Sequence, residues 1–458
     1  MGYDSSWHRF RSLYDYIVDS GMYIPPINDL RFGKLKEYPL DENGEDKLVR
    51  FKERYNSNLT FTILTSVLQN TSMLYMGHPG SGKTTTAEII SSAVYDLPLS
   101  TVHAASIKGH PELTSEDMLV WFDVFASLKS QKEVIGMREF MKNPVRILDE
   151  GNRIPSGKLS NLLEILDRGW VKYKDSKVRS RPGPFYMTMN IADAGSFDLP
   201  EALLDRFDIG VIVDYINPWS IDPFMEMKNN KIRSIESRKV EPKHKITNKD
   251  LVQSRKHIYY SVKMPQDIKN KLSHFMAELH SCDKGSSNVE GRTKGHTLFK
   301  KPGALCRDCK HYESPDNICY TTESSFSPRT ISSIYAYSKA LSWWRGKREV
   351  DEDDVRTVTS YASWFKVRPT RTALERDDRY VNDRIGLMQD LWDTASKTYE
   401  KIIEAIPEYK DMTAIYSDYH INNNKPDDAR LDDLLSKVKM IDSPSKHMLS
   451  AAISNMMD

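Results

Sequence analysis

The chain has 458 residues, of which 39% are hydrophobic and 28% are charged. This composition excludes a chain that is disordered throughout, and the length gives room for two or three domains. The 65 basic and 64 acidic residues leave a formal net charge of +1, so the whole chain has no bulk attraction to DNA or to an anionic membrane. Apolar runs fall far short of the roughly 20 residues of a membrane-spanning helix, and residues 1–12 contain no hydrophobic signal region. We therefore expect a soluble, intracellular protein of the cytoplasm.

Short apolar runs alternate with helical stretches in the first half of the chain. A helix is expected at residues 59–70, and buried strands are expected at 73–76, 98–104, 145–148, 185–189 and 209–213. Strands that alternate with helices predict a parallel sheet covered by helices on both faces. The expected fold class is therefore α/β, and the α/β block is expected to span residues 56–217.

The rest of the chain is expected to be mostly helical. Residues 221–260 carry ten Lys or Arg against five acids and show no clear periodicity, which indicates a basic linker. Helical patterns follow at 268–279, after Ser327 and Pro328, after Asp351 and over 382–406. The expected domains are an N-terminal segment 1–55, the core 56–217, a linker 218–264, an all-α lid 265–370 with an insertion at 281–320, and a helical C-terminal extension 371–458.

A glycine-rich phosphate-binding motif follows the first predicted strand. Residues 77–84 read GHPGSGKT, which matches the pattern GxxxxGK[ST] between a strand and a helix. In such a loop, backbone N–H groups converge on phosphate oxygens, the lysine neutralises the β and γ phosphates, and the hydroxyl of the last residue binds magnesium. We expect a nucleotide to be bound by Gly77, Pro79, Gly80, Ser81, Gly82, Lys83, Thr84 and Thr85, with Thr84 as a magnesium ligand.

Two carboxylates follow the predicted strand at 145–148. Asp149 and Glu150 lie at its carboxyl end, which is the edge of a parallel sheet where ligands bind. We expect Asp149 to hold magnesium and Glu150 to orient or deprotonate an attacking water, as phosphoryl transfer requires. A pair of acids after a strand is common, but its position 65 residues behind Thr84 makes the pattern specific.

Asn190 and Arg206 are two further polar candidates near the sheet. Asn190 ends the predicted strand at 185–189 and is expected to face the same edge as the two carboxylates. The alternative is that Asn190 only satisfies the backbone of its own loop. Arg206 lies in the sequence LLDRFD, and the alternative to a functional role is an ordinary surface ion pair.

All cysteines of the chain are clustered. They are Cys282, Cys306, Cys309 and Cys319. Two disulfides are not expected in a reducing compartment, and a CxxC motif with two further thiols supplies the four ligands of a structural Zn2+ site. A metal would also stabilise a segment with little apolar core. The alternatives are an iron–sulfur cluster, unligated thiols, or the replacement of one thiol by His280, His296 or His311.

Together these motifs resemble the AAA+ ATPases, and more closely the MoxR group, a relative of the MCM helicases and magnesium chelatases. The resemblance covers about residues 56–215 and 325–367. Besides the glycine-rich loop, it depends on the segments IKGHPELTSEDM at 107–118, ILDEGNRIPSGKLSNLLEILDRG at 147–169 and LPEALLDRFD at 199–208. The cysteine segment and the tail after about residue 370 have no counterpart in the group.

The resemblance implies roles for the polar residues of these segments. Lys83 and Thr84 would bind phosphate and magnesium, and Asp149 and Glu150 would form the second acidic motif. Asn190 would sense the γ phosphate, although Ile191 follows it where the group often has proline.

The resemblance also implies roles for three arginines. Arg206 would be a finger that reaches the nucleotide of the neighbouring subunit, and Arg329 would be a second sensor on the helical lid. Arg168 is a weaker candidate for an arginine that acts on a neighbouring subunit.

The resemblance predicts a ring, most simply a hexamer, that couples hydrolysis of ATP with Mg2+ to the remodelling or assembly of a protein partner. In this group the partner often carries a von Willebrand A domain, which would here be a separate protein. One alternative is an MCM-like nucleic-acid motor that uses the basic segments 221–260 and 291–310. Another is a structural ring that binds nucleotide and barely hydrolyses it.

Overall fold

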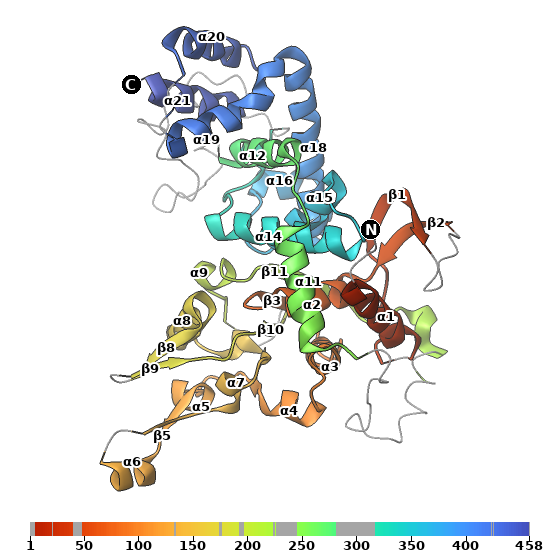
Figure 1. Cartoon of the computed structure of the whole chain (residues 1–458), viewed down its shortest axis with the longest axis vertical. Coiled ribbons are helices and arrows are strands. Elements are labelled where there is room, and N and C mark those ends of the chain that lie inside the picture. The colour runs from red at the N-terminus through yellow and green to blue at the C-terminus, as the bar shows by residue number, and fades with distance from the viewer. Residues whose placement is uncertain are drawn as a thin grey trace. The chain divides into compact units, whose positions relative to one another are not determined.

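The computed structural model describes residues 5–20, 22–39, 48–131, 134–173, 176–191, 197–222, 225, 245–280, 317–422, 424 and 426–457. The chain forms two compact units (Figure 1). The first unit comprises residues 1–262 and 339–348, and the second comprises residues 263–338 and 349–458. The domain limits expected from the sequence stay predictions.

A five-stranded parallel sheet forms the centre of the first unit. Its order is β11-β3-β10-β7-β4, and the strands are β3 (Ser72–Gly77), β4 (Ser106–Lys108), β7 (Arg146–Asp149), β10 (Phe185–Asn190) and β11 (Ile209–Val213). Gly77 at the end of β3 lies level with Val213 of β11 and with Asn190 of β10. The predicted α/β class with a parallel sheet is therefore confirmed, and three strands end side by side.

The second strand of the sheet was wrongly predicted. Residues 98–104 were expected to be a strand, but Leu99–Ala104 form helix α4, and the strand is β4. Leu99 and Val102 are both buried and are three residues apart, which is the spacing of one helix face. The true strand, with the sequence SIK, contains a single apolar residue and therefore gives no apolar run to detect.

Helices α2 (Ser57–Leu68) and α3 (Lys83–Tyr95) pack against the sheet. Every residue of α2 is buried, and the side chain of Asn56 caps it by accepting a hydrogen bond from the backbone N–H of Leu59. The remaining helices near the sheet are α4, α5 (Ser115–Met118), α7 (Glu139–Lys142), α8 (Ser160–Arg168) and α9 (Glu201–Leu204), with the 3-10 helices η1 (Gly151–Arg153), η2 (Ser156–Lys158) and η3 (Pro218–Ser220).

Two antiparallel hairpins extend from the first unit (Figure 1). One pairs β5 (Val120–Phe122) with β6 (Ile135–Met137) and carries α6 (Val124–Ser130) between its strands. The other pairs β8 (Trp170–Tyr173) with β9 (Ser176–Arg179). Neither hairpin was expected from the sequence.

The N-terminal segment folds onto the first unit. It contains α1 (Ser5–Asp19) and an antiparallel pair of β1 (Leu30–Pro39) with β2 (Leu48–Tyr55). The indole N–H of Trp7 donates to the carbonyl of Trp344 at 3.1 Å, and Arg345 Nε lies 2.7 Å from Glu53 Oε2. Both members of this ion pair are buried, and the loss of one partner of a buried pair typically costs about 3–5 kcal/mol. These contacts fix residues 339–348 in the first unit.

Residues 248–260, which lie in the expected basic linker, form helix α11 (Asn248–Tyr260). A capping box between Thr247 and Asp250 begins the helix. Its buried face consists mainly of Leu251, Ser254 and Ile258, so it presents a narrow stripe with few apolar residues. Because this narrow stripe lies among basic residues, the sequence of α11 shows no clear helical periodicity of apolar residues.

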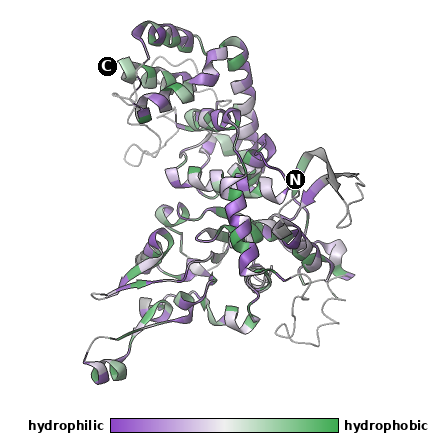
Figure 2. Ribbon diagram, in the orientation of Figure 1, coloured by the Kyte–Doolittle hydropathy of each residue, from purple (hydrophilic) through white to green (hydrophobic). Residues whose placement is uncertain are grey.

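The second unit is helical, as predicted. Its elements are α12 (Gln266–His280), α13 (Ile318–Thr321), α14 (Pro328–Trp344), whose last residues belong to the first unit, α15 (Glu352–Ser363), α16 (Arg371–Arg376), α17 (Arg379–Asn382), α18 (Arg384–Ala405), η7 (Pro407–Asp411), α19 (Met412–Asn422), α20 (Asp428–Lys439) and α21 (Ser445–Met457). Figure 2 shows hydrophobic and hydrophilic residues mixed along α18 to α21, as expected for helices that bury one face. Buried side chains from the end of α18 through to α21 form one apolar cluster that includes Tyr399, Leu431 and Ile453.

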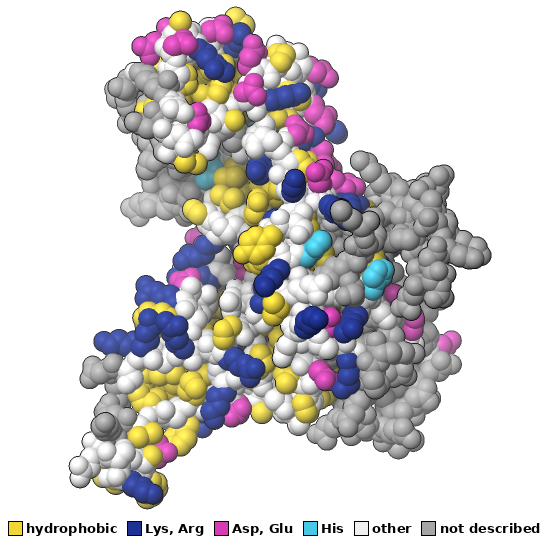
Figure 3. Space-filling model, viewed as in Figure 1, with side chains coloured by type: hydrophobic (Ala, Val, Ile, Leu, Met, Phe, Trp, Pro, Cys, Tyr) yellow, Lys and Arg dark blue, Asp and Glu magenta, His cyan; other side chains and the backbone are white. Residues whose placement is uncertain are grey.

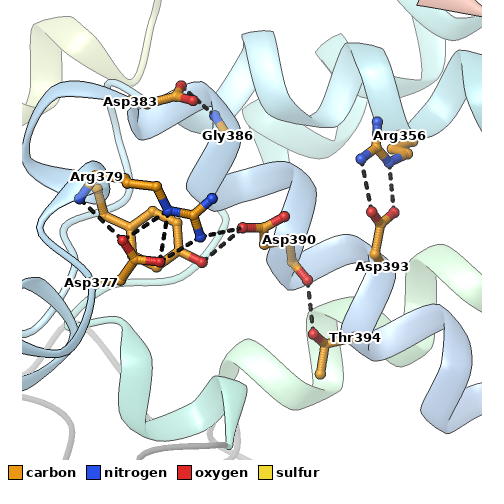
Figure 4. Close-up of polar contacts among 9 residues, drawn as sticks. Arg356, Asp377, Arg379, Asp383, Gly386, Asp390, Asp393 and Thr394 are labelled. Carbon is orange, nitrogen blue, oxygen red and sulfur yellow. Dashed lines mark hydrogen bonds and ion pairs between the residues drawn. The ribbon is translucent and has the colours of Figure 1, made fainter.

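The expected helix starts in the second unit are confirmed. The hydroxyl of Ser327 accepts a hydrogen bond from the backbone N–H of Thr330, and Asp351 forms a capping box with Asp354. Figure 4 shows how α15 is fixed to α18: Arg356 donates two hydrogen bonds, of 2.6 and 2.7 Å, to the carboxylate of Asp393.

Most of the predicted cysteine site lies outside the described residues, and this applies to Cys282, Cys306 and Cys309 as well as to His296 and His311. Cys319 is buried in α13, and the ring of His280 lies 3.1 Å from the hydroxyl of Ser325. Within the described ranges, no group of three or more His, Cys, Asp or Glu is placed to hold a metal ion. In the same ranges, no helix is both long and apolar enough to cross a membrane.

Candidate nucleotide site

The glycine-rich loop connects β3 to α3 at the carboxyl edge of the sheet. Gly82 is the N-cap of α3 and has a φ of +88°, a conformation that glycine adopts without strain. Gly77 is required for a different reason, because a Cβ there would lie 2.3 Å from the carbonyl oxygen of Val213 on the adjacent strand. The loop thus places the N-terminus of α3, with its unpaired N–H groups, directly after β3.

Lys83 is the first residue of α3, and its side chain folds back over the loop. Its Nζ donates hydrogen bonds to the carbonyl oxygens of Gly77 at 3.0 Å and of His78 at 2.7 Å. Burial lowers the pKa of Lys83, and the charges of Asp149 and Glu150 oppose that change. The ammonium group therefore lies within the electrostatic reach of both carboxylates, as the sequence pattern suggested.

Thr84 and Asp149 meet although they are 65 residues apart in the sequence. The Thr84 hydroxyl donates a hydrogen bond to Asp149 Oδ1, and the hydroxyl of Thr188 donates to the same oxygen at 2.6 Å. A carboxylate beside a hydroxyl is a set of hard oxygen ligands, which magnesium prefers. The residues present therefore fit the cation that the sequence predicts.

Glu150 follows Asp149 in an unusual backbone conformation. Its φ is +51°, in the left-handed region that non-glycine residues rarely adopt. The backbone N–H of Glu150 donates to the hydroxyl of Thr188 at 2.9 Å, and the amide nitrogen of Asn190 lies 3.4 Å from Oε1. These contacts hold the residue in its strained conformation.

The other carboxylate oxygen of Glu150 is electrostatically paired. Oε2 is buried, and it lies 3.4 Å from both Lys108 Nζ and Arg153 Nε. It accepts no hydrogen bond from the described residues. Oε2 therefore retains hydrogen-bonding capacity beside Asp149 that no described residue uses.

Thr188 is a component of this site that the sequence analysis missed. It lies in β10, two residues before Asn190, and is fully buried. Its hydroxyl contacts both Asp149 and the backbone of Glu150. The available signal was the period of two along a strand, which places residues 188 and 190 on the same face.

Arg206 lies near the amino ends of the strands, whereas the glycine-rich loop lies at their carboxyl ends. The hydroxyl of Ser72, at the start of β3, donates to the carbonyl oxygen of Arg206 at 2.7 Å. Five steps along β3 separate Ser72 from Gly77, which is roughly 17 Å at about 3.3 Å per residue. Arg206 therefore does not reach the loop of its own chain.

The guanidinium of Arg206 forms an ion pair within the chain. Its Nε and Nη2 lie 2.9 and 2.7 Å from Asp167 Oδ2, next to the end of α8. This is the ion pair that the sequence left open as an alternative. Arg168, the weaker candidate, has its Nη1 3.6 Å from Glu164 Oε1. Arg329 lies exposed in the first turn of α14, in the second unit.

Residues 72–207 match the protein family described as AAA domain (dynein-related subfamily). A Lon protease from Rickettsia bellii is 25% identical over 228 residues, which cover 45% of this chain. The chain spans only 28% of the length of that relative.

A solved structure has a similar fold over most of the chain. It is a protein from Cytophaga hutchinsonii described as a proposed ATPase, with a TM-score of 0.55 and 14% sequence identity. The similarity covers 83% of this chain and 95% of the other. At this identity it is evidence about the fold alone. The resemblance to AAA ATPases deduced from the sequence is confirmed for part of the chain: residues 72–207 form an AAA domain of the dynein-related subfamily.

Proposed function

We propose that this chain assembles into a ring, by its resemblance a hexamer, that couples ATP hydrolysis to the remodelling or assembly of a protein partner. The observation that carries the proposal is the convergence of five polar side chains at the carboxyl edge of the sheet. They are Lys83, Thr84, Asp149, Glu150 and Asn190. Lys83 and Thr84 begin α3 after β3, Asp149 and Glu150 lie at the end of β7, and Asn190 ends β10, so the parallel register brings them together.

ATP and Mg2+ are the ligands typical of AAA domains, and the site has groups for both. Lys83 would exchange its two loop carbonyls for phosphate oxygens, and the N–H groups at the start of α3 would bind the phosphate chain. Thr84 and Asp149 would hold the cation, which neutralises charge on the β and γ phosphates when bound.

Glu150 would orient the attacking water and accept its proton. Asn190 lies against one oxygen of this carboxylate and would sense the γ phosphate from the same position. Thr188 would act as a positioning residue, because its hydroxyl links Asp149 to the backbone of Glu150.

Arg206 supports the assembly part of the proposal. Its place at the amino end of β3 keeps it away from the loop of its own chain, so a role at a nucleotide requires a second copy. In that copy, Arg206 would leave Asp167 and stabilise the charge that develops on the transferred phosphate. Arg329 would act as the second sensor on the lid.

A protein client is favoured by an exposed apolar surface on α6. Phe125 and Leu128 are 86% and 74% exposed, and Val124 beside them is also exposed. Exposed apolar patches on a soluble fold commonly mark contacts with proteins. By the resemblance, the partner would be a separate protein with a von Willebrand A domain.

One observation favours the alternative of a nucleic-acid motor. Residues 168–181 carry six basic side chains against one acid, and the ammonium of Lys177 lies 3.9 Å from the centre of the Trp170 ring. Figure 3 shows Lys and Arg side chains gathered over α8, α9 and the β8–β9 hairpin. Phosphate backbones bind such surfaces. We place this function second because the chain as a whole is nearly neutral.

We expect Thr188→Val to lower kcat for ATP hydrolysis at least tenfold with little change in KM. The substitution changes the shape of the side chain little but removes the hydroxyl that positions Asp149 and Glu150. Thr188→Ser keeps that hydroxyl and should retain most of the activity. Steady-state ATPase kinetics test this, and a valine variant with wild-type kcat would contradict the positioning role.

We expect Arg206→Ala and Lys83→Ala to be inactive alone and active when mixed. In a mixed ring, the Lys83→Ala subunit supplies an arginine and the Arg206→Ala subunit supplies an intact phosphate-binding loop. Asp167→Asn is the control, because it removes the ion-pair partner of Arg206 within the chain and should preserve most turnover. ATPase rates across mixing ratios test the shared site, and no recovery at any ratio would count against it.

We also propose that Cys282, Cys306, Cys309 and Cys319 bind one structural Zn2+, because four thiolates make a closed tetrahedral site. Elemental analysis of the purified chain should then find one zinc per polypeptide. Substitution of Cys306 and Cys309 by serine should remove the metal and lower the thermal midpoint. Iron with labile sulfide in the preparation would instead identify a cluster.

A further inference from the structure

The sheet order indicates where the nucleoside part of a bound nucleotide lies. This inference rests on the proposed ATP site. Asp149 ends β7 and Glu150 follows it, Asn190 ends β10, and both strands lie on one side of β3. The γ phosphate, on which these groups act, therefore faces that side. The chain of phosphates continues through the loop, so the nucleoside extends toward the other side of β3, where β11 lies.

A stacked aromatic pair is located on that other side. Val213 at the end of β11 is level with Gly77 at the end of β3, so the two segments leave the sheet next to each other. Tyr215 and His78 follow these strand ends, and their rings stack with centroids 5.2 Å apart and an angle of 9° between the planes. His78 is the second residue of the phosphate-binding loop, so the pair is part of the wall of the nucleotide site.

The ring of Tyr215 is both supported and accessible. One side of it stacks on His78, yet the residue remains 58% exposed. A tyrosine buried in the core could not contact a ligand. A tyrosine on the surface without a neighbouring ring would lose rotamer freedom when a ligand binds. The contact with His78 restrains the ring before any ligand arrives, which lowers that entropic cost.

We propose that Tyr215, supported by His78, is the platform on which the base of the bound nucleotide stacks. Aromatic side chains stack on nucleobases through their π faces, and every base offers such a face. The platform would therefore make the chain bind a nucleotide more tightly than inorganic tripolyphosphate. It would contribute little discrimination between adenine and guanine, because stacking does not read the edge of the base.

Calorimetric binding of three ligands to the full chain, with magnesium present, tests this assignment. The ligands are ATP, GTP and inorganic tripolyphosphate, which has the phosphates without a base. We expect Tyr215→Ala to weaken ATP and GTP by a similar factor of about five or more, and to leave tripolyphosphate unchanged. Tyr215→Phe keeps the ring and should keep the nucleotide affinity. Trp219→Ala is the matched control, because Trp219 is 92% exposed in the same segment.

The outcomes separate this inference from the proposed ATP site. If Tyr215→Ala binds ATP as tightly as the wild-type chain, the platform is overturned while the ATP site stands. If Tyr215→Ala weakens tripolyphosphate as much as ATP, the residue acts on the loop and not on the base, and the assignment is again overturned. A wild-type chain that binds none of the three ligands more tightly than Lys83→Ala would contradict the ATP site itself.

Discussion

The candidate site depends on parallel strands that end at the same edge of the sheet, and the hydrogen bond between Thr84 and Asp149 is the clearest result of this arrangement. The two residues lie on different elements, and they meet because parallel strands of the sheet end at the same edge. Parallel pairing brings the ends of β3, β7 and β10 to that edge, and the loop after β3 turns into a helix whose N-terminus faces it. A shift of register by one residue would turn the side chains of a strand to its other face and separate these groups.

The same edge contains a strained residue. Glu150 has positive φ, and its conformation is maintained by Thr188, through the backbone N–H, and by Asn190, through the carboxylate. Strain of this kind costs on the order of 1–3 kcal/mol and persists only where neighbouring contacts enforce it. We interpret the strained backbone as the means by which the carboxylate is held against Asn190 and close to Lys108 and Arg153.

Much of this site could be predicted from the sequence, because its signals are local. The glycine-rich loop has fixed spacing, and Asp149 with Glu150 follows a recognisable apolar run. Thr188 could not be singled out in the same way, because threonine is common in strands and its hydroxyl gives no pattern. The ion pair of Arg206 with Asp167 joins residues 39 positions apart, and only the fold brings them together.

The errors in the fold have similar causes. The apolar run at 98–104 indicates a strand in the sequence, but the burial of Leu99 and Val102 follows helical spacing. Helix α11 was missed because its buried face has few apolar residues. The packing of the N-terminal segment could not be predicted from the sequence, because Glu53 and Arg345, which form its buried ion pair, are 292 residues apart. In each case tertiary contacts decided the outcome where the local pattern was weak.

The most direct test of the account is a comparison of ATP binding and ATP turnover in Glu150→Gln. The variant keeps the size of the side chain but removes its charge, so it cannot accept a proton from water. The account predicts that this chain binds ATP with near wild-type affinity and that its turnover falls by two orders of magnitude or more. Undiminished hydrolysis in Glu150→Gln would remove Glu150 from the mechanism and contradict the assignment of this edge of the sheet as the catalytic site.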